Sequence, residues 1–184
     1  VTSDYLNDQN STGPKTHGKF QKTTVDVYQL NRLTDEINFK AYGSIQFSDK
    51  NLDSAEKFSL GGVSGIRAYP SGEGSGDEGY KFSLEFQHDL SKTSQNFDFL
   101  GSIFYDYGKI KQYKDSSNVS LTTPNQYDLS GWGVSFDLIH RNNFKINLIW
   151  SQAIGDNKGK SASGNNSDGR GGSVRSWFLL TADF

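Results

Sequence analysis

The sequence contains no cysteine, so a disulfide framework and a thiolate metal site are both excluded. No run of apolar residues approaches the roughly 18 that a membrane-spanning helix needs. Hydrophobic residues make up only 33% of the chain, below the share of about 45–50% that is typical of soluble domains. The first residues, VTSDYLND, lack a basic region followed by an apolar core, so no signal peptide is expected there. If the protein crosses an inner membrane, we expect the chain to be a mature form or a fragment.

Charge and motifs exclude several classes of function. The balance of 19 Lys and Arg against 21 Asp and Glu gives a net charge of −2, without the basic excess of a nucleic-acid binder. His17, His88 and His140 fall on different segments without metal-ligand spacing. No G-x-S-x-G elbow, H-E-x-x-H pair or P-loop is present, so neither an enzyme nor a cofactor is expected. The acidic, glycine-rich segments 72–79 and 156–171 lack the register of an EF-hand and are interpreted as mobile surface loops.

Alternation of apolar and polar residues is the main pattern present. Aromatic residues reach 14% of the chain, and many stand at or near the ends of the alternating segments. Each segment has the length of about 10 residues that a tilted strand needs to cross a bilayer. The predicted strands are 19–30, 37–47, 80–89, 97–108, 131–138, 144–151 and 174–184, and residues 1–8 resemble the end of a further strand.

Short and long connections alternate along the chain. The short ones centre near Thr34, Ser94 and Asn142, and the long ones near Gly13, Gly65, Ser120 and Gly164. Transmembrane barrels have short turns at one rim and long loops at the other, whereas a soluble sandwich mixes loop lengths at both ends. We therefore predict an all-β fold, an antiparallel transmembrane β-barrel. A soluble β-sandwich acting as a binding module remains the alternative, because any sheet with one wet face alternates.

The long loop 48–79 carries the only constellation of charged residues that suggests a site. Arg67 lies near its middle, and Asp106 and Glu85 occupy the polar register of two following strands. If the loop folds inward, Arg67 can pair with these carboxylates through bidentate, charge-assisted hydrogen bonds. If the loop stays outside, Asp106 lines a pore wall and Arg67 is solvated. The residues alone leave both arrangements open.

The loop GIRAYPSGEGSGDEGY, the strand KFSLEFQHDL and the segment FYDYG resemble the C-terminal barrel region of two-partner secretion transporters. This is the TpsB, or haemolysin secretion/activation, family, which shares a superfamily with the barrel-assembly protein BamA. In that superfamily a V-R-G-[YF] motif marks the tip of a loop that folds into the lumen, and its arginine pairs with the aspartate of an F-x-D-x-G motif. The matching tip residues are Ile66, Arg67, Ala68 and Tyr69, of which Ala68 departs from the glycine, and the matching strand residues are Phe104, Asp106 and Gly108.

The resemblance implies a sixteen-stranded barrel of which residues 1–184 supply the C-terminal half, about seven to eight strands. The first half of the barrel, a plug helix and the periplasmic POTRA domains would then be missing. It also implies that Phe184, a terminal aromatic in the lipid-facing register, serves as an assembly signal.

The implied function is export of a large exoprotein, TpsA, across the lipid bilayer of the outer membrane of a Gram-negative bacterium. The lumen would be lined by residues that include Lys40, Ser83, Glu85 and Asp106. The implied alternative is a BamA-like factor that assembles or inserts other outer-membrane proteins.

Overall fold

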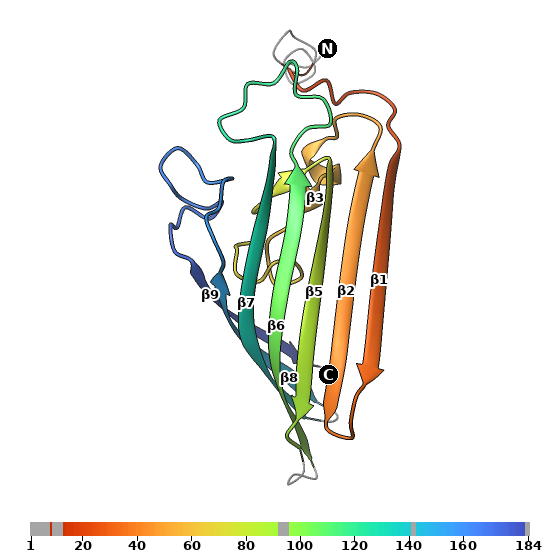
Figure 1. Ribbon diagram of the computed structural model, residues 1–184, viewed down its shortest axis with the longest axis vertical. Helices are drawn as coiled ribbons and strands as arrows, with labels where there is room; N and C mark the ends of the chain where they lie inside the picture. The colour runs from red at the N-terminus through yellow and green to blue at the C-terminus, as the bar shows by residue number, and fades with distance from the viewer. Residues whose placement is uncertain (1–7, 9–12, 92–95, 141–142, 183–184) are drawn as a thin grey trace.

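Seven antiparallel strands form one curved sheet in the computed structural model, which describes residues 8, 13–91, 96–140 and 143–182 (Figure 1). The strands are β1 Lys22–Arg32, β2 Ile37–Ser48, β5 Glu78–Asp89, β6 Phe97–Lys111, β7 Gln126–His140, β8 Phe144–Ala153 and β9 Val174–Ala182. They neighbour one another in the order β1-β2-β5-β6-β7-β8-β9. Each strand therefore pairs with the next long strand along the chain, which is the meander that the alternating loops predict.

Loop lengths are segregated between the two ends of the sheet. The short connections 33–36, 90–96 and 141–143 follow β1, β5 and β7, and the long connections 49–77, 112–125 and 154–173 follow β2, β6 and β8. In Figure 1 the long loops leave the upper ends of the strands, and the β2–β5 loop descends from there beside the sheet. The predicted alternation of turns and long loops is confirmed for the connections that the described strands flank.

The convex face of the sheet is apolar and exposed. Ile103 on β6 pairs with Val134 on β7, and these side chains are 53% and 44% exposed. Trp132 and Trp150 meet edge to face, with 5.6 Å between their ring centroids. A continuous exposed apolar face on a sheet is the surface that a barrel presents to lipid, so the predicted apolar register is confirmed.

The concave face carries mostly polar side chains. Gln87, Ser102 and Ser135 are cross-strand neighbours on β5, β6 and β7, and each is less than a tenth exposed. Polar residues on the inside of a closed sheet are typical of barrels that enclose water or polypeptide. We call the space on this side of the sheet the lumen.

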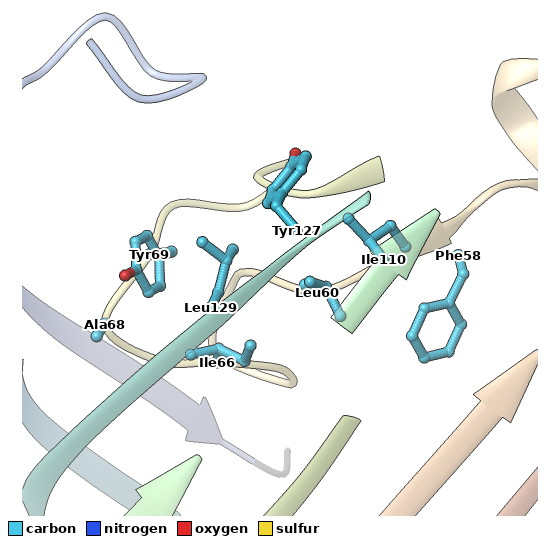
Figure 2. Packing of buried hydrophobic residues seen from close by; sticks show 8 residues of the cluster. All are labelled: Phe58, Leu60, Ile66, Ala68, Tyr69, Ile110, Tyr127 and Leu129. Atoms are coloured by element: carbon cyan, nitrogen blue, oxygen red, sulfur yellow. The ribbon is translucent and has the colours of Figure 1, made fainter. Parts of the chain in front are cut away.

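An apolar cluster interrupts the polar lumen near the long-loop end. It joins the loop between β2 and β5 to the ends of β6 and β7, and Figure 2 shows its side chains facing one another. Its members are Phe58, Leu60, Ile66, Ala68, Tyr69, Ile110, Tyr127 and Leu129. Because these side chains are at most 7% exposed, the cluster attaches the loop to the sheet by hydrophobic burial.

Strand boundaries differ from the prediction by up to three residues at β1, β2, β5 and β8, and the largest difference is at the β6–β7 hairpin. β6 continues to Lys111 and β7 begins at Gln126, where the sequence predicts a loop. The added residues include Ile110 and Tyr127, whose side chains are buried against the loop cluster. The apolar side chains of these added residues face the luminal loop, so packing against a distant loop accompanies the extension of both strands.

The soluble-sandwich alternative does not fit the architecture. A sandwich needs a second sheet on the first, and the other sheet in the described part of the chain consists only of β3 Phe58–Ser59 and β4 Ser75–Gly76. Within the described residues, no helix has the length and apolar character to span a membrane. Phe184 and residues 1–7 lie outside the described residues, so the predicted assembly signal and most of the preceding strand remain predictions.

Candidate functional site

The loop between β2 and β5, residues 49–77, folds onto the lumen side of the sheet, and we call it the luminal loop. It contains a short 3-10 helix, Ser54–Glu56, and the β3–β4 pair. At its tip Tyr69 N donates to Ile66 O over 3.0 Å, closing a turn, and Gly62 N donates to Tyr69 O over 3.1 Å. Leu60 O accepts from Ile66 N over 2.8 Å. These bonds give the tip a fixed conformation, with Arg67 inside the turn that Ile66 and Tyr69 close.

Arg67 and Asp106 form a bidentate pair on the wall of β6. Nε of Arg67 donates to Oδ2 of Asp106 over 3.0 Å, and Nη2 donates to Oδ1 over 2.9 Å. The main-chain N–H of Arg67 also donates to Oδ2 over 3.0 Å. Arg67 is 9% exposed and Asp106 is 1% exposed. Two parallel charge-assisted bonds in a site that excludes most water are a strong and directional contact.

The rest of the guanidinium contacts β5 and an aromatic ring of β6. Nη1 donates to Glu85 Oε2 over 2.9 Å, and Nη2 donates to Ser83 Oγ over 2.9 Å. The guanidinium carbon lies 3.2 Å from the centroid of the Phe104 ring, a cation–π contact. Lysine could not reproduce this set, because only a planar guanidinium combines a bidentate fork with stacking.

The main-chain oxygen of Arg67 is bound from the opposite side. Ser151 Oγ on β8 and Trp177 Nε1 on β9 each donate to it over 2.8 Å. Arg67 therefore bridges β5 and β6 through its side chain and β8 and β9 through its carbonyl. The tip of the luminal loop connects strands that do not neighbour one another in the sheet.

Two glycines on the wall leave room for the luminal loop. A Cβ on Gly108 would lie 2.7 Å from Leu60 Cδ2, and a Cβ on Gly131 would lie 2.5 Å from Ala68 Cβ. Both separations are far inside ordinary carbon contact distances. Ala68 itself does not have a positive φ, since Lys15 is the only non-glycine residue in the described part of the chain that does. Alanine in place of the motif glycine is thus compatible with this tip.

The base of the luminal loop is tied to the loop between β6 and β7. Asp77 is fully buried, with Oδ1 accepting from Leu52 N over 3.1 Å and Oδ2 from Lys114 N over 2.8 Å. Lys57 Nζ lies 2.9 Å from Oδ1. The interpretation of segment 72–79 as a mobile surface loop is wrong for Asp77, because the sequence pattern gives no sign of partners that come from distant loops.

The predicted site residues are brought together except at one position. Ile66, Ala68 and Tyr69 belong to the buried cluster, Phe104 and Gly108 flank Asp106 on β6, and Ser83 and Glu85 face Arg67. Lys40 Nζ reaches Glu85 Oε1 over 3.4 Å. The exception is Phe184, which is outside the described residues. Among the described residues, no group of three His, Asp or Glu side chains is placed to hold a metal ion.

Sequence reasoning missed Ser151, Trp177 and Gly131. One signal was available, because Trp177 precedes the outward-facing Phe178 and therefore lies in the polar register of β9, where an aromatic is unexpected. Ser151 and Gly131 carry no such signal, since serine and glycine are ordinary on the inner wall of a barrel.

Comparison with known proteins identifies the family. Residues 4–138 match the haemolysin secretion/activation protein family ShlB/FhaC/HecB. The chain belongs to this family. The matched span contains both the luminal loop and the F-x-D-x-G strand, so the resemblance to TpsB transporters is confirmed.

Two similar proteins are both transporters by name. The haem/hemopexin transporter protein HuxB of Haemophilus influenzae is 33% identical over 157 residues, which cover 80% of this chain and 28% of that protein. HuxB of strain 86-028NP is 36% identical over 112 residues, 61% of this chain and 20% of that protein. The chain thus spans less than a third of the length of these relatives, which are transporters and not enzymes by name.

A solved structure gives the same fold. CdiB from Escherichia coli superposes with a TM-score of 0.70 at 16% identity, and the match covers 96% of this chain and 30% of CdiB. At this identity the likeness establishes the fold alone. The curved seven-stranded sheet therefore has the β-barrel fold that was predicted.

Proposed function

We propose that this chain is the C-terminal part of an outer-membrane pore that exports a partner exoprotein of the TpsA type. The apolar convex face contacts lipid, the polar concave face lines the export path, and the luminal loop stands in that path. The remaining strands and the periplasmic domains that receive the exoprotein belong to other parts of the full-length protein. The relation to HuxB, which is named for haem and hemopexin, makes a secreted haem-acquisition protein the first partner to test.

The observation that supports the proposal most strongly is the set of contacts that the buried Arg67 side chain makes. Its guanidinium contacts Asp106, Glu85 and Ser83. A loop that only joins two strands at the surface does not require a buried arginine with three side-chain partners. We infer that the Arg67–Asp106 pair anchors the loop in the conformation that export requires. Breaking a buried pair leaves an uncompensated charge, which costs about 3–5 kcal/mol, so either truncation should release the tip.

Secretion tests the proposal directly. The full-length transporter carrying Arg67→Ala or Asp106→Ala should export much less exoprotein than wild type when barrel abundance in the outer membrane is equal. Arg32→Ala is the matched control, because Arg32 and its partner Asp35 are 67% and 97% exposed and such pairs contribute little. Export at the wild-type rate by both truncations would refute the anchoring role.

Depletion of the protein separates export from assembly. Depletion of an exporter should leave the abundance of other outer-membrane proteins unchanged and abolish one secreted product. A BamA-like assembly factor would instead lower the abundance of many barrels, and that outcome would replace the proposed function by the alternative.

A further inference from the structure

The outer limb of the luminal loop, residues 70–74, is bound by the loop between β8 and β9. Glu73 is 2% exposed, although it lies in a segment that the sequence suggested was mobile. Its Oε1 accepts from Asn157 Nδ2 over 2.6 Å, and its Oε2 accepts from Ser167 N over 2.6 Å. Ser167 Oγ also donates to Ser71 O over 3.4 Å. Both carboxylate oxygens of Glu73 are thus engaged by residues more than eighty positions away.

The partners of Glu73 are held in one orientation. Asn157 Oδ1 accepts from Gly159 N over 2.8 Å, and Asn157 Nδ2 donates to Asn166 Oδ1 over 3.0 Å. These bonds fix which end of the Asn157 amide faces Glu73. Glutamine at position 73 would meet the Nδ2 donor with its own NH₂ group or give up the bond to Ser167, so the site requires an acceptor on both sides.

The same hairpin contacts the luminal loop at two levels. β8 and β9 bind the Arg67 carbonyl through Ser151 and Trp177, and the loop that joins them binds Glu73. The two contacts use different residues and different chemistry, so the second can be removed while the first is kept. The Arg67–Asp106 pair does not depend on Glu73 through any shared atom.

We propose that Glu73 is a positioning residue of the export site, which fixes the outer limb of the luminal loop to the β8–β9 loop and thereby holds that limb in the position that export requires. The inference rests on the proposed export function. It adds a second anchor, to the β8–β9 loop, beside the first anchor at Asp106 on β6. Losing it frees the limb but leaves the Arg67–Asp106 pair in place.

Glu73→Ala and Glu73→Gln in the full-length transporter provide the first test. Export should fall several-fold in both at equal barrel abundance, because glutamine also loses one of the two bonds, either to Asn157 or to Ser167. Trypsin added to intact cells should cleave the β8–β9 loop after Lys158 or Arg170 several-fold faster than in wild type. Faster cleavage reports detachment of the loop whether or not an exoprotein is exported.

A covalent replacement distinguishes positioning from general destabilisation. Residues 1–184 contain no cysteine, so in a full-length transporter whose other cysteines, if any, are replaced by serine, Ser71→Cys and Ser167→Cys can be joined by a short, reducible bis-methanethiosulfonate linker. In the Glu73→Ala background this link should restore export, and reduction should abolish it again. The control is Ser161→Cys with Ser163→Cys, whose hydroxyls lie 2.9 Å apart within the β8–β9 loop and whose linkage should restore nothing.

Each outcome decides for or against the inference. Rescue by the 71–167 link alone supports it. Normal export by both Glu73 variants, or no rescue at a verified 71–167 link, overturns it. If the wild-type transporter exports no exoprotein, the proposed function is refuted, whatever the state of the Glu73 contact. The trypsin assay then tests that contact alone, and an unchanged cleavage rate in the Glu73 variants would refute the second anchor.

Discussion

The indole of Trp177 donates to the main-chain oxygen of Arg67 over 2.8 Å, so β9 holds the luminal loop at the same residue whose side chain is bound by β6. The bond comes from a strand 110 positions along the chain. It is directed at the backbone and is independent of the Arg67 side chain. The tip is thus held from two sides, and the contribution of each can be measured separately.

Trp177→Phe removes one donor and keeps an aromatic ring. A net contribution of about 1 kcal/mol is usual for a neutral hydrogen bond, and Ser151 still donates to the same oxygen. We expect the free energy of unfolding in detergent to fall by about 1 kcal/mol. Trp150→Phe is the control, since Trp150 lies on the convex face and is 38% exposed. Equal losses in the two variants would contradict a specific role for the Trp177 indole.

Gly131 and Ala68 lie in contact, and we expect that glycine and alanine can be swapped between the two positions. Gly131→Ala places a Cβ 2.5 Å from Ala68 Cβ, and overpacking of this kind costs about 1–3 kcal/mol. Adding Ala68→Gly removes that clash and leaves Gln152 O at 3.1 Å as the nearest remaining atom. The double variant should therefore regain most of the thermal stability that Gly131→Ala loses. Additive losses in the double variant would show that the two residues do not meet.

The sheet could be predicted from the sequence because each strand carries its own two-residue period. Phe82, Leu84 and Phe86 identify a lipid-facing register without any knowledge of the neighbouring strands. The extensions of β6 to Lys111 and of β7 from Gln126 could not be read in this way, since those residues are ordered by packing against the luminal loop.

The Arg67–Asp106 pairing was accessible through the resemblance to a family motif, whereas the residues alone left Arg67 free to be exposed. Partners of the loop backbone and of Glu73 were beyond prediction. They depend on which distant loops meet in space, and Asn157 or Ser167 looks the same in sequence whether it binds a carboxylate or water.

A double-mutant cycle on Arg67 and Asp106 measures their coupling. Each alanine variant should lose about 3–5 kcal/mol of unfolding free energy, because the partner is left buried and unpaired. The double variant should lose clearly less than the sum, by about 1–3 kcal/mol. The exposed Arg32–Asp35 pair gives the comparison cycle, with coupling below about 1 kcal/mol. Heat-induced unfolding of the barrel on gels provides the measurement, and strict additivity would argue against a direct pair.

Tyr69, beside Arg67 in the luminal loop, gives the site a pH dependence at the alkaline end. Burial, and after it the negative charges of Glu73, Asp128 and Asp156, together raise the pKa of Tyr69 to about 12 from an ordinary 10.0. Folding therefore favours the neutral phenol. The resulting stability is fully present below pH 10, the ordinary value, and is lost as the pH rises through the folded pKa.

The difference in unfolding free energy between wild type and Tyr69→Phe should thus be constant at neutral pH and shift in favour of the phenylalanine variant above pH 10. Urea unfolding in detergent at several alkaline pH values measures it, and the ultraviolet absorbance of tyrosinate gives the pKa directly. Glu73→Gln should lower the pKa of Tyr69, because it removes one of the negative charges that oppose ionisation. A pH-independent difference, with Tyr69 titrating at its ordinary value, would mean that this side chain is solvated and that the luminal loop does not pack as described.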